Sequence, residues 1–150
     1  MTCSRRLWRM SLGADGFTLL ELLVAMTIVG ILASLALPGY AAILQRARRN
    51  EAKLALLRIQ HAQEKHYQRH LTYTDALDGG ALGVGTTSES GAYALTVTLR
   101  DGGQAYQAEA RVIAGGPQAS DARCAMLTVD DTGLRSARSE SGDTSETCWE

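Results

Sequence analysis

A single carboxylate, Glu21, stands near the start of a long apolar run and requires a cationic partner. Residues 22–45 carry no charged side chain. An ionised carboxylate inserted into lipid costs about 2.5–3.5 kcal/mol on insertion scales, so it persists there only when it is paired. No basic side chain lies within one turn of Glu21, but cleavage between Gly16 and Phe17 would create an α-amino group one turn away. The spacing predicts a processed N-terminus whose amine pairs with Glu21 of the same chain or of a neighbouring copy.

The element that must position Glu21 is a membrane-length helix. Residues 22–45 would reach about 36 Å as a helix, which exceeds the roughly 30 Å of a hydrocarbon core. An ordinary secretory signal has a shorter apolar region, about 7–15 residues, with its cleavage site behind it. Residues 45–70 lack Gly and Pro and continue the helix. Pro38 removes one backbone hydrogen bond and is predicted to bend or loosen the helix there.

The second half of this helix is predicted to be amphipathic, with one apolar face for packing. That face comprises Ala52, Ala55, Ile59, Ala62 and His66, with Leu56 beside them. A loop rich in Gly, Thr and Ser follows over 71–91. Strands are predicted at 92–99, 104–114, 124–130 and 134–138, and the Asp and Gly residues of RDGGQ and DDTG indicate turns between them. The expected head is a meander of antiparallel strands lying on the amphipathic half of the helix.

The three cysteines divide across the apolar run. Cys3 precedes it, whereas Cys124 and Cys148 follow it. If the run crosses a membrane, Cys124 and Cys148 share the opposite side from Cys3 and can form a disulfide in an oxidising compartment. Two thiols in a cytosolic domain are the alternative, and the membrane run favours the disulfide. Closing this loop would stabilise the fold by roughly 3–4 kcal/mol in the chain-entropy model.

The segment GFTLLELLVAMTIVGILASLALPGY closely resembles the N-terminal signature of type IV pilins and their pseudopilin relatives. That signature has a short basic leader, Gly before the cut, Phe after it, Glu as the fifth mature residue and Pro as the twenty-second. Counted from Phe17, Glu21 is fifth and Pro38 is twenty-second. The C-terminal segment RCAMLTVDDTGLRSARSESGDTSETCW resembles the disulfide-closed end of PilE-type minor pilins.

The resemblance implies an α+β fold, the type IV pilin fold, in which a long N-terminal helix packs on a small antiparallel sheet with a C-terminal disulfide loop. It implies that a prepilin peptidase and methyltransferase cleaves after Gly16 and methylates the Phe17 amine, which Glu21 of a neighbouring subunit then neutralises. The expected segments are a leader (1–16), a transmembrane and filament-core half-helix (17–44), an amphipathic half-helix (45–70) and a globular head (71–150).

The expected location is the inner membrane, with a single pass and a periplasmic head, and then the pilus. The expected partners are other pilin subunits, the peptidase, the pilus assembly machinery and inner-membrane lipid. The chain is interpreted as a type IV pilus subunit, a minor pilin that takes part in pilus assembly and initiation and so in twitching motility and adhesion. The alternatives are a type II secretion pseudopilin, which shares the N-terminal signature, a DNA-binding competence pilin, and a stably anchored periplasmic monomer with an uncut leader.

Arg46, Arg48 and Arg49 form a basic patch behind the apolar run. DNA capture is one interpretation of this patch, and an anchor for lipid headgroups and subunit contacts is the other. We favour the anchor, because the patch lacks the interleaved aromatic residues that stack on single strands. The whole chain has 15 Lys and Arg against 16 Asp and Glu, a balance that implies no bulk attraction to nucleic acid. Nucleic acid is therefore not an expected partner.

The remaining motifs are interpreted structurally. The segment 80–87, GALGVGTT, has the glycine spacing of a phosphate-binding loop but Thr86 where the lysine is required. The DTG at 131–133 matches aspartic proteases but fits a hairpin turn. His66 and His70 lie one helical turn apart without a Cys or a suitably spaced acid, so we expect a solvated helix end rather than a metal site. No catalysis, cofactor or metal is predicted.

Overall fold

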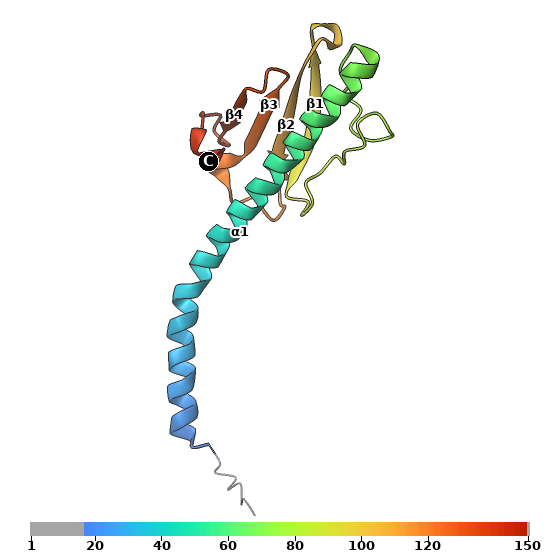
Figure 1. The fold of residues 1–150 in the computed structure, drawn as a ribbon. Helices are drawn as coiled ribbons and strands as arrows, with labels where there is room; N and C mark the ends of the chain where they lie inside the picture. The colour runs from blue at the N-terminus through green and yellow to red at the C-terminus, as the bar shows by residue number, and fades with distance from the viewer. Residues whose placement is uncertain (1–16, 150) are drawn as a thin grey trace, which may run out of the picture. The chain divides into compact units, whose positions relative to one another are not determined.

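The computed structural model describes residues 17–149 (Figure 1). The chain divides between Gly39 and Tyr40 into two compact units. Helix α1 (Leu19–His70) contributes to both units, and all four strands belong to the second. The leader predicted at 1–16 lies outside the described residues. Pro38 is part of α1, but its side chain lies outside the described set, and the bend predicted there stays a prediction.

Helix α1 has 52 residues, which confirms the long helix expected from the sequence. Its final turn closes when the Leu71 N–H donates to the Tyr67 carbonyl at 2.8 Å. Leu71 adopts φ 57°, a left-handed conformation that commonly ends helices and that Gly adopts without a steric penalty. The leucine side chain is exposed there, so packing does not compensate for the strained backbone.

The sheet is a four-stranded antiparallel meander in the order β1-β2-β3-β4. Its strands are β1 (Tyr93–Arg100), β2 (Ala105–Val112), β3 (Met126–Asp130) and β4 (Arg135–Arg138). The β1–β2 hairpin turns through Asp101–Gly103, where the predicted Asp-Gly-Gly turn is found, and Gly102 and Gly103 both have positive φ. Each predicted strand is present with boundaries shifted by one or two residues. The sequence pattern was sufficient here because alternation and turn residues are local signals.

The core lies between the sheet and the second half of α1, which runs across one face of the strands (Figure 1). Alternate residues along each strand face this core, and the residues between them face away from it. The fully buried contributors are Ala52, Leu56 and Ile59 from α1, Tyr93 from β1, Tyr106, Ala108 and Ala110 from β2, and Leu127 from β3. The predicted α+β architecture is confirmed.

One part of the predicted helical face is wrong. Ala62 and His66 are only partly buried, and Gln63 is fully buried instead. The Gln63 carboxamide replaces backbone pairing for the chain after the helix, because its Oε1 accepts the N–H of Thr74 at 3.1 Å and its Nε2 donates to the Thr74 carbonyl. A buried polar group is tolerated when its hydrogen bonds are satisfied, so hydrophobicity alone mis-assigned this turn of the helix.

The predicted disulfide is present. Cys124 and Cys148 are bonded and almost completely buried. The adjacent Trp149 donates from its indole Nε1 to the Ser136 carbonyl of β4 at 2.8 Å. The polar C-terminal segment is thereby held against the last strand of the sheet.

Candidate functional site

Glu21 occupies a helix-capping position at the start of α1. The Thr18 Oγ1 accepts the N–H of Glu21 at 3.2 Å, and Thr18 directly precedes the first helical residue. Thr followed three residues later by Glu is the capping-box pattern, and a carboxylate in the first turn also complements the positive end of the helix dipole. Thr18 was not among the predicted site residues, although the T-x-x-E spacing of residues 18–21 indicates such a cap. Glu21 thus joins the helix cap through its backbone N–H, and the pairing of its carboxylate with the Phe17 amine stays a prediction.

The first half of α1 presents an apolar surface on all sides. Every side chain from Phe17 to Ser34 is exposed. α1 contains one stretch that is long and apolar enough to cross a membrane, with a mean hydropathy of 2.3. Exposed apolar area on this scale requires cover by lipid or by other helices. The cleavage junction itself cannot be placed, because Gly16 lies outside the described residues.

Two of the three arginines behind the apolar run, Arg48 and Arg49, form hydrogen bonds within the head. Arg49 forms a two-point ion pair with Asp121, with both N–O distances at 2.6 Å, and Asp121 is almost fully buried. Arg48 donates to the Pro117 carbonyl at 2.6 Å. Burial raises the pKa of Asp121, but the hydrogen bonds and charge of Arg49 outweigh burial and lower it below its usual value. These contacts attach α1 to the β2–β3 connection, a role within the head that neither interpretation of the patch included.

The residues that contact the arginine patch were not predicted from the sequence. Asp121 lies 72 positions after Arg49, and Gln118 is fully buried beside it, donating to the Asp121 Oδ2 at 2.7 Å and to the Gln45 carbonyl at 3.2 Å. Asp121 is the N-cap of the short turn Ala122–Cys124, and its carboxylate accepts the Cys124 N–H. This capping position is the one feature of Asp121 that the local sequence could have indicated.

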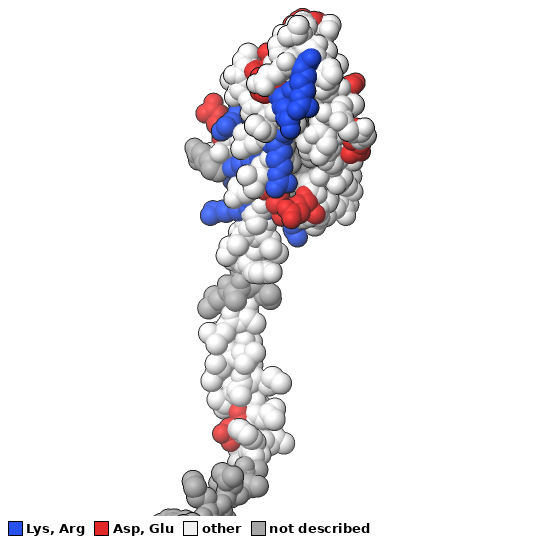
Figure 2. All heavy atoms as spheres, turned by 45° about the vertical axis from the view of Figure 1, so that its right-hand side comes forward, with Lys and Arg blue, Asp and Glu red and all other residues white. Residues whose placement is uncertain are grey.

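A different set of cations forms a line on the exposed face of α1. Arg58, Lys65 and Arg69 are spaced i, i+7 and i+11, which places them within about 20° of one line and over about 16 Å of helix. Figure 2 shows Lys and Arg side chains gathered along this side of the head. All three are exposed, and none has a carboxylate partner within residues 17–149. We call Arg58, Lys65 and Arg69 the helical basic line.

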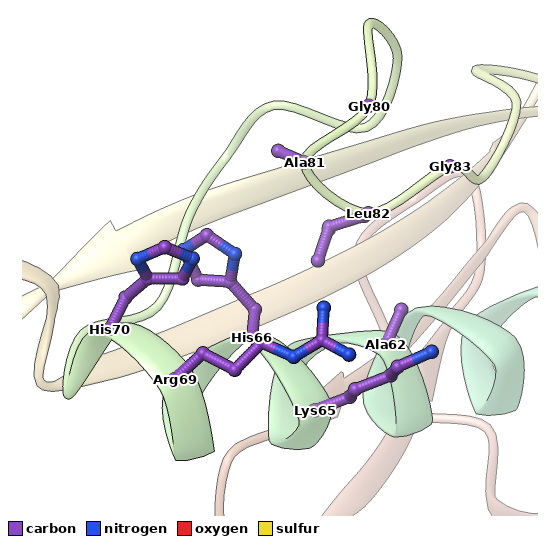
Figure 3. A pocket seen from close by; sticks show the side chains of 9 residues that line it. All are labelled: Ala62, Lys65, His66, Arg69, His70, Gly80, Ala81, Leu82 and Gly83. Carbon is purple, nitrogen blue, oxygen red and sulfur yellow. The ribbon is translucent and has the colours of Figure 1, made fainter.

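The end of this line borders a small pocket between α1 and residues 80–83 (Figure 3). The pocket has a volume of about 260 Å³, and its charged or titratable lining residues are Lys65, His66, Arg69 and His70. No carboxylate lines it. The imidazole rings of His66 and His70 stack with centroids 4.3 Å apart. Burial lowers the pKa of the His66 imidazole, and the neighbouring His70 and Arg69 side chains lower it further.

This lining suits an anion better than a metal ion. Lys65 and Arg69 remain positively charged and lack acceptor atoms, so they repel a cation and donate to oxyanions. Within residues 17–149, no group of three or more His, Cys, Asp or Glu side chains is arranged for a metal. The C-terminal end of a helix carries about half a negative charge, which two full cations exceed.

The two motif-like segments have the local structures expected of turns and connections. Asp130 accepts the N–H groups of Thr132 and Leu134 through its Oδ1, at 3.0 and 2.9 Å, so the DTG segment is the turn before β4. Residues 80–87 form an irregular connection between α1 and β1, and Gly80 and Gly83 take positive φ there.

Residues 38–128 match the family model described as type IV minor pilin ComP, DNA uptake sequence receptor, and residues 13–37 match the prokaryotic N-terminal methylation motif. A fimbrial protein of Neisseria meningitidis serogroup B is 38% identical over 88 residues, which cover 58% of this chain and 51% of that protein. The type IV major pilin protein PilE of Neisseria gonorrhoeae is 36% identical and covers 58% and 52%. PilA of Myxococcus xanthus, also a type IV major pilin protein, is 37% identical over 60 residues, covering 40% and 27%.

The chain spans about half the length, or less, of the curated relatives it matches. Among solved structures, a type IV pilin from Shewanella oneidensis is 23% identical, with a TM-score of 0.46, and the match covers 61% of this chain and 89% of that one.

Proposed function

We propose that this chain, which belongs to the family of type IV minor pilins described as ComP, DNA uptake sequence receptor, is a pilus subunit whose head binds duplex DNA. The family match over 38–128 includes the whole helical basic line. The observation that carries the proposal is this line: three exposed cations on one face, without carboxylate partners in the described part of the chain.

This proposal reverses the preference drawn from the sequence. Nucleic acid was not an expected partner because the arginine patch lacks stacking aromatic residues, but such stacking matters for single strands. A duplex is bound mainly through its phosphates, for which exposed Lys and Arg side chains suffice. The sequence-based interpretation also considered Arg48 and Arg49 as DNA-binding residues, but both already form hydrogen bonds within the head.

The geometry of the helical basic line suits a phosphate backbone. Its cations extend along about 16 Å of a straight helical face, and its far end opens into the pocket lined by Lys65 and Arg69. A phosphate in that pocket would receive charge-assisted hydrogen bonds from both side chains. Arg58, at the other end of the line, would contact a second phosphate of the same strand.

The test is the salt dependence of DNA binding by the full chain in non-ionic detergent. Fluorescence anisotropy with a labelled duplex should give a slope of about −2.7 in log K against log salt for three phosphate contacts, so affinity should fall about forty-fold between 50 and 200 mM salt. The variant R58Q/K65Q/R69Q should lose most of this affinity and most of this slope, about one unit for each cation removed.

The matched control removes the same charge from the opposite face of the sheet. Arg100, Arg111 and Arg138 lie on strands, point away from α1 and are exposed. R100Q/R111Q/R138Q should bind DNA nearly as well as the unaltered chain. Equal losses in both triple variants would mean that net charge, not the helical basic line, drives binding.

Assembly into a filament is the second part of the proposed function. The chain is a type IV pilin subunit, and its relatives are structural subunits. We infer that a prepilin peptidase removes residues 1–16 and methylates Phe17, that 17–44 holds the subunit in the inner membrane, and that 71–150 faces the periplasm. The methylation-motif match over 13–37 and the exposed apolar surface of α1 support this route. Mass measurement of membrane-extracted protein tests it, because an intact Met1 terminus would contradict processing.

A further inference from the structure

A second basic cavity lies where α1 enters the head, beside the disulfide. It has a volume of about 480 Å³, within the range of about 300–1,000 Å³ that is typical of ligand sites. Its polar lining consists of Arg46, Arg49, Asn50 and Lys53 from α1, Arg123 from the turn Ala122–Cys124, and Thr147 from the turn Glu146–Cys148. The Cys124–Cys148 bond holds the last two segments together across the cavity wall.

The lining is cationic and contains no carboxylate. Arg49 is held in place by its ion pair with Asp121, which does not line the cavity. Arg46 and Arg123 are exposed, come from different elements and have no carboxylate partner within residues 17–149. Guanidinium groups donate paired hydrogen bonds that match the geometry of a phosphate, so the cavity offers two such donors from two different elements.

The position of the cavity along α1 indicates the source of the phosphate. Arg46 is the first charged residue after the uncharged segment 22–45, and Arg49 and Lys53 follow about one and two turns later. The polar headgroup layer of a bilayer is roughly 5–7 Å thick on each side of the hydrocarbon core. A helix that spans the membrane with 22–45 would therefore place the mouth of this cavity at headgroup depth.

We propose that this cavity binds the phosphate of an anionic phospholipid while the subunit resides in the membrane. Arg46 and Arg123 grip the phosphate oxygens, and Thr147 and Asn50 offer hydrogen bonds to the glycerol of the headgroup. The site is separate from the helical basic line and does not depend on DNA binding by the head. It requires only that α1 is membrane-inserted.

The test is native mass spectrometry of the full chain released from nanodiscs that contain phosphatidylcholine and phosphatidylglycerol. The chain should retain phosphatidylglycerol and not phosphatidylcholine. R46Q/R123Q should weaken this retention about twenty-five-fold, which is about five-fold, or about 1 kcal/mol, for each cation. R46K/R123K keeps both charges but loses the paired hydrogen bonds, and it should retain an intermediate amount. Inorganic phosphate, added as a separate probe, should compete only at concentrations far above those of the lipid.

The matched control is R100Q/R138Q, which removes two exposed arginines outside the cavity. Unchanged lipid retention in R100Q/R138Q with loss in R46Q/R123Q supports the site. Equal loss in both variants would overturn it, as would equal affinity for phosphatidylcholine. If R46Q/R123Q instead weakens duplex DNA binding and leaves lipid retention intact, the cavity belongs to the nucleic-acid surface and the lipid assignment is wrong.

Discussion

The two halves of α1 bury their apolar side chains in different ways. In residues 40–70, Ala52, Leu56 and Ile59 are fully buried by the sheet of the same chain. In residues 19–34, every side chain is exposed, including Leu20 at 73% and Leu32 at 62%. The second half is apolar on one stripe, which a single sheet can cover, whereas the first half is apolar on all sides and no single surface can cover it. The apolar side chains of α1 are therefore covered by the chain's own sheet along one half of the helix. Along the other half they need lipid or other helices to cover them.

The largest effect is expected from removing the acid of the first half. Glu21→Ala should leave membrane insertion intact but abolish incorporation into filaments, because the docking amine then has no carboxylate. Glu51→Ala makes the same change in the second half, where the carboxylate accepts the Ser90 N–H at 3.1 Å, and should leave incorporation nearly unchanged. Immunoblots of sheared pili and of membranes measure both outcomes. Normal levels of Glu21→Ala subunits in pili would refute this role.

A matched pair of leucines tests the difference in packing. Leu56→Ala should lower the free energy of unfolding of the head by about 2–5 kcal/mol, because Leu56 is fully buried and its loss leaves a cavity. Leu23→Ala, at a side chain that is 58% exposed, should change head stability by less than about 0.5 kcal/mol. Denaturant unfolding of the processed chain in detergent can be followed by Trp149, the only tryptophan left after the leader is removed. Similar losses in the two variants would contradict the division of α1.

The disulfide should stabilise the head alone. Replacing both cysteines, as C124S/C148S, should cost roughly 3–4 kcal/mol in the chain-entropy model while membrane insertion stays unchanged. Unfolding curves of the unaltered chain with and without reductant provide an independent measurement. Identical midpoints in the two redox states would show that the bond adds no stability.

The ion pair between Arg49 and Asp121 predicts acid sensitivity of the head. Because the folded state lowers the pKa of Asp121, this group adds stability above its usual pKa of 3.8, and that stability is lost as pH falls through the lower folded value. Asp121→Asn should cost roughly 3 kcal/mol at pH 7, since it leaves Arg49 without its counter-charge. It should also flatten the decline in stability below pH 4. If stability declines below pH 4 in Asp121→Asn as steeply as in the unaltered chain, this ion pair is not the cause of the decline.

The smallest effect is a gain in stability at the end of the helix. Leu71→Gly should stabilise the head by about 0.5 kcal/mol, because it relieves a left-handed conformation at an exposed side chain and its benefit is partly offset by the greater freedom of Gly in the unfolded chain. Leu71→Ala, which keeps the strained φ, is the control and should not stabilise. A loss of stability with Gly would mean that the leucine side chain contributes packing.

Features that depend on local periodicity and local chemistry were predictable from the amino-acid sequence. The helical extent of α1, the alternation in β1 and β2, the turn at Asp101–Gly103 and the Cys124–Cys148 pairing were all predictable, because each is written in neighbouring residues or in a count of cysteines. The match between Glu21 and the N-terminal motif is of the same kind.

Which charged and polar side chains already have a partner depends on long-range contacts in the folded chain. Arg49 is neutralised by an acid 72 positions away, whereas Arg58, Lys65 and Arg69 remain available on the exposed face of α1. Gln63 is buried in place of His66 because a backbone segment after the helix satisfies its carboxamide. These outcomes depend on contacts between residues far apart in the chain, for which hydrophobic patterning carries no signal. Where a free cation lies on this head is therefore a property of the folded chain and not of its composition.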